Sequence, residues 1–383
     1  MTRKRILFVA AEMAARAFLP EPIKGVAEDH DVALASPSPD PELLRSLGSD
    51  GPSYTIPIAR PMRPLQDLKA LAALIRLMRR ERFDAVHSVT PKAGLLAMVA
   101  GRIAGIPIRT HSFTGQVWVT RTGFKRGLLK GVDRLLHQLT SFSLVDSPSQ
   151  RDFLIAEGVI APARSAVLAD GSISGVDLGR FRPDPAARAR IRAELGLAEA
   201  DLVFLYLGRL TGDKGLQDLV PAFAAVRRDH RHARLLLVGP DEEQLGAELL
   251  RLAGDQAAGL SLVGPTNAPE AYMAAADLFC LPSYREGFGS VLIEAAAAGL
   301  PAIASRIYGI VDAVADGETG FLHPPGDAAE IERLMRLLVE DEALRSRLGR
   351  AALERARTRF SSARLRDAFR DYYAKAFAGS RSS

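Results

Sequence analysis

The chain has 383 residues, of which 48% are hydrophobic and 25% charged, and its formal net charge is +5 at pH 7. This composition is typical of globular proteins, and the length favours two domains. Cys280 is the only cysteine, which excludes a disulfide framework and fits a cytoplasmic setting. The apolar run Ile6–Ala11 is too short for a signal peptide core, and no uninterrupted apolar run of the sequence approaches the roughly 18 residues of a membrane span, so a soluble protein is expected.

Short apolar runs alternate with longer amphipathic runs along the whole chain. The predicted strands of the first half are Arg5–Ala11, Asp31–Ala35, Tyr54–Ile58, Phe83–His87, Ile106–His111, Ser143–Asp146 and Ser165–Ala169. Those of the second half are Leu202–Leu207, Arg234–Val238, Leu260–Val263, Leu278–Pro282, Ala302–Ala304 and Gly320–His323. Helical patterns lie between them, as in Leu65–Arg80 and Leu216–Arg228. The alternation predicts an α/β protein with parallel sheets covered by helices on both faces.

The alternating pattern restarts at Leu202, after a polar segment, Phe181–Asp201, that we interpret as the connection between two doubly wound, Rossmann-like domains. The predicted domains are residues 1–180 and 181–361, and a last helix of about residues 362–383 is expected to pack back on the first domain. Ligands bind beyond the carboxyl ends of the strands in such sheets. Two facing sheets therefore predict a deep cleft between the domains.

Positive charge is concentrated between residues 54 and 134, where fifteen Lys and Arg accompany four Asp and Glu. Such a block indicates an anionic partner, which would be a membrane surface, a diphosphate or a nucleic acid. The alternative is a solvated basic face. No nucleic-acid recognition module is apparent, so nucleic acid is not expected as a partner.

Two segments that follow predicted strands have side chains suited to binding a phosphorylated, hydroxyl-rich ligand. The segment Glu286–Glu294 has two carboxylates around a glycine turn that opens a helix, where backbone N–H groups favour an anion and carboxylates accept hydrogen bonds from hydroxyls. The segment Gly208–Gly215 carries Arg209 and Lys214 among glycines, and both side chains suit phosphate oxygens. Together, these features predict a ligand that is an anion with many hydroxyl groups, and a nucleotide sugar is such a ligand. The alternative is a pair of solvent-facing cations on a glycine turn.

The first half offers a second group of candidates after its strands. His87 ends one strand, Thr90 is the predicted N-cap of the next helix, and Lys92 would lie near that helix N-terminus, where a phosphate would be stabilised. A plain helix start with an exposed lysine is the alternative. His111 ends the following strand, and its position favours a role in a site over a structural role.

Trp118, the only tryptophan, begins a run in which apolar and cationic side chains alternate as on a membrane-surface element. The alternative is an amphipathic helix that packs on its own sheet. The other members of the run are Arg121, Phe124, Lys125, Arg126, Leu128, Leu129 and Lys130.

Seven motifs of the second half, in this order and spacing, resemble the retaining glycosyltransferases of family 4, which have the GT-B fold. They are Gly208-Arg209-Leu210, Lys214-Gly215, Leu262-Val263-Gly264, Ala276-Asp277-Leu278-Phe279, Leu281–Gly289, Glu294-Ala295 and Gly299-Leu300-Pro301. The resemblance covers nearly the whole chain. It implies that the domain of residues 1–180 binds the acceptor and the domain of residues 181–361 binds the nucleotide sugar.

The resemblance also implies roles for individual residues. Arg209 and Lys214 would bind the donor diphosphate, and Glu286 would hold the transferred sugar. Glu294 would accept hydrogen bonds from the ribose hydroxyls, and the loop after Val263 would lie against the base. The expected donor-binding residues are Gly208, Arg209, Lys214, Gly264, Pro265, Glu286, Gly287, Phe288, Gly289 and Glu294. The expected acceptor-binding residues are His87, Thr90, Lys92, His111 and Trp118. The expected catalytic residues are Arg209, Lys214, Glu286 and His111.

The segments His87–Gly94 and Phe113–Trp118 are similar to those of bacterial polysaccharide and lipid-linked oligosaccharide transferases. This likeness implies a UDP-sugar donor, a lipid-diphosphate or glycan acceptor, and a peripheral location on the inner face of the plasma membrane. One departure from the family is the first loop, Ala10–Leu19, which lacks a Gly-Gly pair beside the donor phosphates.

Neither a metal nor a cofactor is expected. The Asp-x-Asp pattern of metal-dependent transferases occurs only at Asp29-His30-Asp31, before a strand, where it is typical of a turn. We expect Arg209 and Lys214 to replace the metal, with same-face attack on the donor sugar. Two alternatives stay open: a GT-B-like nucleotide-sugar epimerase, and a non-catalytic module that binds a membrane surface.

Overall fold

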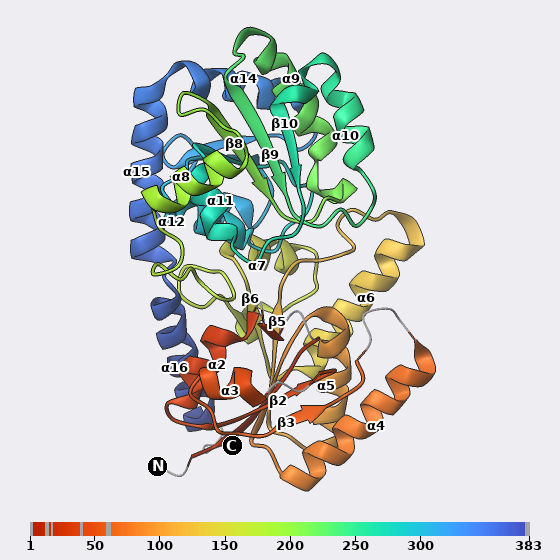
Figure 1. The fold of residues 1–383 in the computed structure, drawn as a ribbon. Helices are drawn as coiled ribbons and strands as arrows, with labels where there is room; N and C mark the ends of the chain where they lie inside the picture. The colour runs from red at the N-terminus through yellow and green to blue at the C-terminus, as the bar shows by residue number, and fades with distance from the viewer. Residues whose placement is uncertain (1–2, 12–14, 17, 39–40, 59–62, 380–383) are drawn as a thin grey trace. The chain divides into compact units, whose positions relative to one another are not determined.

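The computed structural model describes residues 3–11, 15–16, 18–38, 41–58 and 63–379. The chain divides into two compact units, the first formed by residues 1–175 with 362–383 and the second by residues 176–361 (Figure 1). Each unit holds a parallel sheet that is accompanied by helices. The predicted fold class, α/β with two parallel-sheet Rossmann-like domains, is therefore confirmed.

The first unit has a seven-stranded sheet in the order β3-β2-β1-β4-β5-β6-β7, and its paired strands run parallel. The strand order reverses between β1 and β4. The strands are β1 (Arg5–Val9), β2 (Asp31–Ser36), β3 (Ser53–Thr55), β4 (Ala85–Val89), β5 (Ile108–Phe113), β6 (Phe142–Val145) and β7 (Ser165–Ala166). Each overlaps a strand predicted from the sequence.

Helices of the first unit lie on both faces of this sheet. They are α2 (Pro20–Ala27), α3 (Pro41–Ser46), α4 (Pro64–Glu81), α5 (Pro91–Ala104), α6 (Gly123–Leu139), α7 (Pro148–Ala156), the 3-10 turn η1 (Pro162–Arg164) and α16 (Ser362–Gly379). On one face α5 packs against both α4 and α6, and on the other α16 packs against α2 (Figure 1). The first loop straddles residues 12–14 and 17, which lie outside the described residues, so its departure from the family pattern stays untested.

The C-terminal helix α16 belongs to the core of the first unit, where it was expected to pack. Its buried side chains recur every fourth residue and form one apolar stripe, made of Leu365, Phe369, Tyr373 and Phe377. These side chains join a cluster with Phe8 and Ile23, far away in the sequence. The Tyr373 hydroxyl also hydrogen-bonds with His87 Nδ1 at 2.8 Å.

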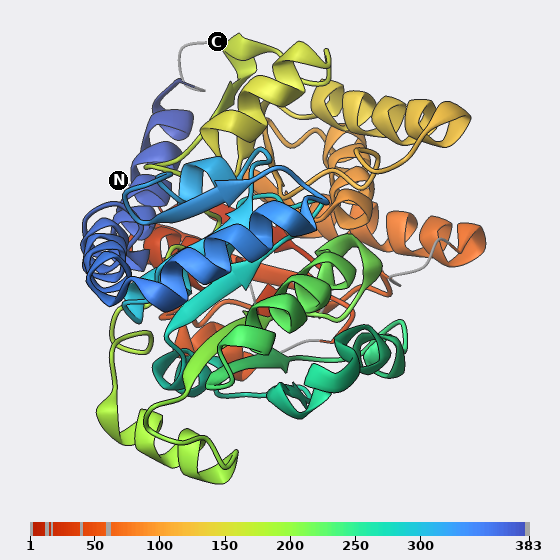
Figure 2. The same ribbon diagram turned by 90° about the horizontal axis from the view of Figure 1, so that it is seen from above.

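The second unit has a six-stranded parallel sheet in the order β10-β9-β8-β11-β12-β13, which reverses between β8 and β11. The strands are β8 (Leu202–Leu207), β9 (Ala233–Val238), β10 (Leu260–Val263), β11 (Leu278–Leu281), β12 (Ala302–Ser305) and β13 (Gly320–His323). The helices are α8 (Pro185–Glu194), η2 (Gly212–Lys214), α9 (Leu216–Asp229), α10 (Gly246–Ala253), η3 (Gly254–Gly259), α11 (Pro269–Ala275), α12 (Ser290–Ala297), α13 (Ile310–Ala313), α14 (Ala328–Glu340) and α15 (Glu342–Arg359). Helices α9 and α14 lie side by side over this sheet (Figure 2).

The segment Phe181–Asp201 is not a connection between the domains, which corrects the interpretation from the sequence. Its helix α8 packs against α11 inside the second unit, and Ile191 is buried there. Arg192 is also buried because its guanidinium donates hydrogen bonds to the carbonyls of Ala275 and Ala198. The arginine-rich sequence of this segment resembles that of a polar linker. In the structure, however, Arg192 hydrogen-bonds to backbone carbonyls inside the second unit. The division between the units falls after residue 175, slightly before the predicted boundary at residue 180.

We expect Phe369→Ala to lower the free energy of unfolding of the first unit by about 3–5 kcal/mol, because it removes a buried ring from the core. The measurement is denaturant unfolding followed by fluorescence of Trp118, the only tryptophan, which is buried in this unit. Lys375→Ala on the exposed side of the same helix is the control and should change stability by less than about 0.5 kcal/mol. Equal, small effects of both changes would show that α16 does not belong to this core.

Candidate active site

The two predicted donor segments meet where the strand order of the second sheet reverses. Gly208–Gly215 follows β8 and residues 282–289 follow β11, and the reversal between these strands is the usual position of a ligand crevice. Lys214 Nζ lies 2.6 Å from Glu286 Oε1, and Ser283 Oγ donates a hydrogen bond to the same oxygen at 2.9 Å. The structure thus brings together the cation and the carboxylate predicted for the diphosphate and the sugar.

The ion pair between Lys214 and Glu286 is largely shielded from water, since the side chains are 14% and 17% exposed. Its position depends on Gly215, which has φ of 69° and lies so close to Pro282 that a Cβ would be 2.1 Å from the Pro282 carbonyl oxygen. Only glycine fits this left-handed, closely approached position. The loop after β8 is therefore held against the loop after β11, and Lys214 reaches Glu286 as a consequence.

Arg209 follows the same strand but does not contact Glu286. Its Nη1 atom donates to Glu242 Oε2 at 2.9 Å, while Gly212 N donates to Glu243 Oε2 at 2.8 Å. Glu242 and Glu243 lie in the turn after β9 and were missed by the sequence reasoning. Their consecutive carboxylates were a visible signal, because a loop after a parallel strand belongs to the ligand edge of the sheet. These carboxylates accept hydrogen bonds from Arg209, which was predicted to bind the donor diphosphate, and from the Gly212 amide.

The turn before α12 has the predicted form. Gly289 adopts φ of 73° and precedes the first helical residue, Ser290, so its backbone opens the helix as expected. The Phe288 ring is buried and meets the Phe360 ring edge-on at 5.4 Å between centroids. Phe288 therefore anchors the turn in the core through its side chain, which leaves its backbone as the part available to a ligand.

Glu294 lies on α12, one turn into the helix, and is only partly exposed. Burial raises the pKa of Glu294 to about 7, and Glu270 raises it further while Arg180 opposes the shift. The carboxyl therefore changes its charge near neutral pH. Gly264 and Pro265 follow β10 and are both exposed, so the predicted base-binding loop is accessible.

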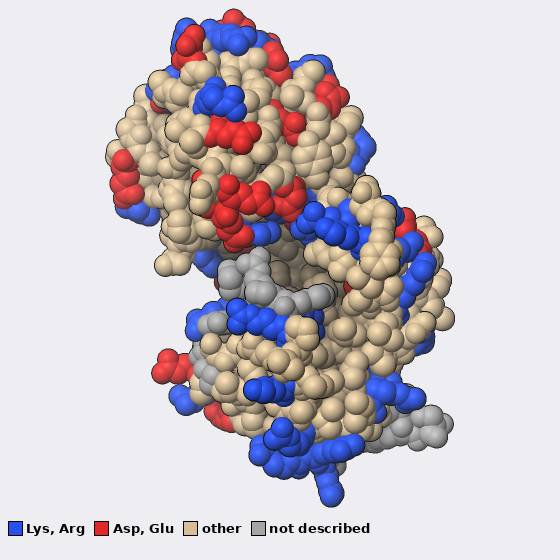
Figure 3. Space-filling model, turned by 90° about the vertical axis from the view of Figure 1, so that its right-hand side faces the viewer, with Lys and Arg blue, Asp and Glu red and all other residues tan. Residues whose placement is uncertain are grey.

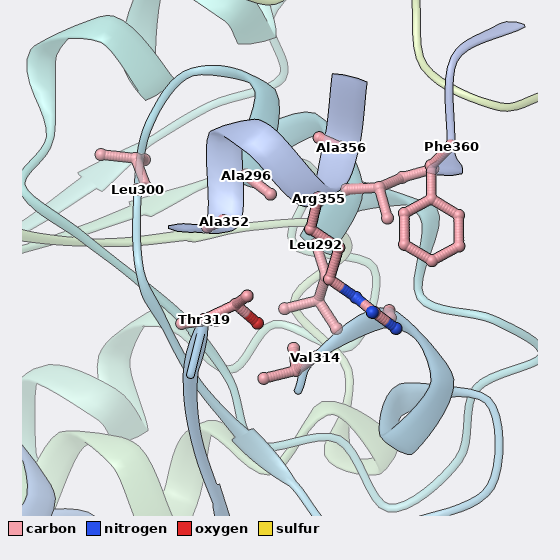
Figure 4. A pocket seen from close by; sticks show the side chains of 12 residues that line it. Leu292, Ala296, Leu300, Val314, Thr319, Ala352, Arg355, Ala356 and Phe360 are labelled. Atoms are coloured by element: carbon pink, nitrogen blue, oxygen red, sulfur yellow. The ribbon is translucent and has the colours of Figure 1, made fainter. Parts of the chain in front are cut away.

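Two cavities of the second unit lie away from the contact between Lys214 and Glu286. The cavity in Figure 4 has a volume of about 10 Å³ and is lined mostly by carbon atoms, including those of Leu292, Val314 and Phe360. A cavity of this size holds a single water molecule at most. A wider groove of about 530 Å³ lies among α8, the segment 298–301 and α15. Neither cavity includes Lys214 or Glu286 in its lining.

In the first unit, the structure corrects the role predicted for His87. The side chain is buried, stacks on Phe8, and has both ring nitrogens engaged, Nδ1 with the Tyr373 hydroxyl at 2.8 Å and Nε2 with Ser112 Oγ at 2.9 Å. Burial lowers the pKa of His87 to about 3, so the ring is neutral. His87 ties α16 to the sheet, and a buried ring with both nitrogens engaged does not fit the predicted contact with an acceptor.

His111 is also buried, with Nδ1 2.9 Å from Ser88 Oγ. Burial lowers its pKa to about 3, and His87 adds to the shift. The ring packs directly on α5, where a Cβ at Gly94 would lie 2.4 Å from it. A neutral His111 is a hydrogen-bonding group rather than a charged one, and its catalytic role stays a prediction.

The start of α5 matches the prediction in position but not in detail. Thr90 precedes the first helical residue, yet its side chain makes no capping hydrogen bond and its φ is 73°. A positive φ is a strained conformation for a β-branched residue, and such strain clusters at functional sites. Lys92 Nζ lies 2.5 Å from Asp67 Oδ1 of α4, so its charge is already compensated within the unit.

Trp118 is fully buried, which corrects its predicted place on a membrane-surface element and as an acceptor contact. Its Nε1 atom donates to Asp133 Oδ2 at 2.7 Å, and its ring stacks on Phe153. Arg126 and Lys130 lie over the same ring at 5.4 and 5.8 Å from its centroid. The alternative prediction was an amphipathic helix that packs on its own sheet. It fits α6, which buries Asp133, Leu136 and His137 and contacts α5 and β5.

Among the described residues, no group of three or more His, Cys, Asp or Glu side chains is arranged to hold a metal ion. Within the same ranges, no helix combines the length and apolar character required to span a bilayer.

Family models match both halves of the chain. Residues 23–171 match the model described as a glycosyl transferase 4-like domain, and residues 187–355 match the model described as glycosyl transferases group 1. The chain is 29% identical over 311 residues to the capsular polysaccharide biosynthesis glycosyltransferase CapM of Staphylococcus aureus, covering 81% of each protein. It is 32% identical over 289 residues to a D-inositol 3-phosphate glycosyltransferase of Arthrobacter sp., covering 71% of this chain and 66% of that protein.

The fold has close counterparts among solved structures. Anabaena HepE, crystallised in complex with UDP and glucose, superposes with a TM-score of 0.80 at 20% identity and covers 98% of this chain and 100% of its own. At this identity the likeness concerns the fold alone, and the family follows from the sequence matches. The chain belongs to the glycosyltransferases of the family 4 type, which have the GT-B fold.

Proposed function

We propose that this glycosyltransferase moves a sugar from a UDP-sugar to a lipid-linked or polysaccharide acceptor, with retention of anomeric configuration, in bacterial cell-surface glycan synthesis. The observation that carries the proposal is the 2.6 Å contact of Lys214 with Glu286 at the strand reversal of the second sheet. The UDP complex of HepE supports a nucleotide-sugar donor. The match to the capsular polysaccharide biosynthesis glycosyltransferase CapM supports a glycan acceptor.

The proposed reaction uses the charges of the second unit to stabilise the leaving group. The bond from the anomeric carbon to the diphosphate breaks, and the acceptor oxygen bonds to the same face of that carbon. The acceptor proton passes to the departing diphosphate. Lys214 and Arg209 stabilise the negative charge that grows on the diphosphate, and Glu286 accepts hydrogen bonds from sugar hydroxyls. For this step Lys214 moves from Glu286, and Arg209 from Glu242, toward the phosphates.

We also propose that the enzyme acts at an anionic membrane surface through the basic region 54–134. Phe124, Leu128 and Leu135 of α6 are 83%, 56% and 45% exposed, and they share the helix surface with the exposed cations Lys125 and Arg134. On α4, Leu65 and Leu68 are exposed as well. Lys and Arg side chains gather on the surface of this unit (Figure 3). Exposed apolar side chains beside cations are the pattern of an interfacial helix, which supports peripheral binding.

The test of the function is a screen of UDP-sugars against undecaprenyl-diphosphate monosaccharides in membranes, read as product mass. Transfer with the sugar attached to the acceptor supports the proposal, and the anomeric configuration of the product decides retention. Release of an epimerised UDP-sugar without any acceptor would establish the epimerase instead.

We expect Lys214→Ala to lower kcat by about 10²–10³-fold, since removing one preorganised stabiliser of developing charge has this effect. EDTA should leave the rate of the unchanged enzyme within twofold, because the arginine and lysine supply the positive charge. Lys4→Ala is the matched control: Lys4 also pairs with a carboxylate, Asp84, at 2.8 Å, but far along the chain from the donor segments, and its loss should leave kcat unchanged. Complete inactivation by EDTA would contradict the metal-independent mechanism.

Donor binding should depend on the charge of Glu294. Its carboxyl is mostly protonated at pH 6 and mostly ionised at pH 8, because its pKa is about 7. If only the ionised form accepts both ribose hydrogen bonds, the Kd for UDP-glucose falls roughly tenfold from pH 6 to pH 8. Titration calorimetry with the unchanged protein and with Glu294→Gln checks this, and the variant should bind weakly with the same Kd at both pH values. A pH dependence that survives in the variant would assign the titration to another group.

Membrane binding should depend on the exposed apolar side chains of α6. We expect Phe124→Ala combined with Leu128→Ala to reduce co-sedimentation with phosphatidylglycerol-containing vesicles several-fold, and salt to reduce binding of the unchanged protein. Leu250→Ala removes an exposed apolar side chain of the second unit and is the control. The absence of vesicle binding at low salt would refute the membrane proposal and leave the proposed transfer reaction unaffected.

A further inference from the structure

Asp146 is a buried carboxyl group at the carboxyl end of the first sheet. It directly follows β6 and is 6% exposed, and among the described residues its carboxyl has no hydrogen-bond or ion-pair partner, since burial is the only influence on its pKa. Its backbone, by contrast, is fully used: the amide donates to the Phe113 carbonyl at 3.3 Å and the carbonyl accepts from Ser172 N at 2.6 Å. Asp146 is therefore held firmly in place while its functional group is left without a partner.

A buried carboxyl without a partner requires an explanation, because such groups are costly to remove from water. Burial raises the pKa of the Asp146 carboxyl well above its usual range. Other buried carboxyls of this chain are used in the structure. Asp133, which is also 6% exposed, accepts from Trp118 Nε1, and Asp201 pairs with Arg234. Asp146 thus lacks the compensating contact that Asp133 and Asp201 have.

The backbone around this end of the sheet is also strained. Of the five non-glycine residues with positive φ in the described part of the chain, three lie in loops that follow strands of this sheet. They are Thr90 after β4, with φ of 73°, and Ala169 and Ser172 after β7, with φ of 48° and 71°. Ser172 is the residue whose amide binds the Asp146 carbonyl. Strained backbone persists where the surrounding structure maintains it and clusters at ligand sites.

We propose that Asp146 is an acceptor-binding residue whose carboxyl forms a hydrogen bond with a hydroxyl of the acceptor sugar. The edge where it lies is the one at which ligands bind in open parallel sheets. A sugar hydroxyl suits the group in either charge state, since it donates to a carboxylate and accepts from a carboxylic acid. This assignment rests on the proposed function, because it takes the first unit to bind a hydroxyl-bearing acceptor.

The kinetic test compares Asp146→Ala with the unchanged enzyme, using a UDP-sugar and undecaprenyl-diphosphate monosaccharides. We expect the KM for the acceptor to rise at least tenfold, while the KM for the UDP-sugar and its slow hydrolysis by water stay within twofold. Asp146→Asn, which keeps a group that donates and accepts, should recover part of the lost acceptor affinity. An unchanged acceptor KM, or equal losses for acceptor and donor, would overturn the proposal.

The stability test separates a binding role from a structural one and needs no substrate. Asp146→Ala should unfold at the same temperature as the unchanged protein or higher, because it removes a buried group without a partner. Asp133→Ala is matched in burial and should lower Tm by on the order of 5 °C, because Trp118 Nε1 loses its acceptor. A fall in Tm for Asp146→Ala as large as that for Asp133→Ala would assign Asp146 to the fold and reject the proposal. Failure of the unchanged enzyme to hydrolyse or transfer from every UDP-sugar would instead reject the proposed function.

Discussion

The contact between Lys214 and Glu286 depends on the parallel arrangement of β8 and β11. Neighbouring parallel strands end at the same edge, and at the reversal of strand order their following loops diverge to opposite faces. Lys214 lies in one of these loops and Glu286 in the other, seventy-two residues later. Gly215 allows the loops to approach because any side chain there would collide with the Pro282 carbonyl. A positive group and a carboxylate are thereby held together at the edge of the sheet where we propose that the donor binds.

Charge in the donor region is balanced by internal partners. Lys214 pairs with Glu286, Arg209 with Glu242, and Asp213 with Arg285. Partly buried cations would be costly without such partners, so the pairs keep the region stable before a donor arrives. In the proposed reaction, the donor exchanges the Lys214 and Arg209 pairs for contacts with its own phosphates and hydroxyls. Glu294 differs from these acids because, among the described residues, no ion pair offsets the burial that raises its pKa to about 7.

Much of this architecture could be predicted from the sequence. All thirteen strands overlap their predicted ranges, because buried parallel strands are short continuous apolar runs bounded by polar turns. The candidate donor residues were predicted for the same reason, since ligands bind beyond the carboxyl ends of such strands, and their roles stay a prediction. The predictions that were wrong concern polar or aromatic side chains whose partners are distant in sequence. His87 is held by Tyr373, Trp118 by Asp133, and Arg192 by backbone carbonyls of the second unit.

The sequence by itself determined the alternation of strands and helices, the two parallel-sheet domains, the family, and the position of Lys214 and Glu286 after strands. These properties follow from local patterns of apolar residues, glycines and charges. Only the tertiary structure decided which side chains are buried and what satisfies them. It assigned His87 to the attachment of α16, placed Trp118 in the core of the first unit, brought Glu242 to Arg209, and left the Asp146 carboxyl without a partner among the described residues. The physical reason is that the burial and hydrogen bonding of a polar side chain depend on residues that folding brings near, and sequence spacing does not encode their distance.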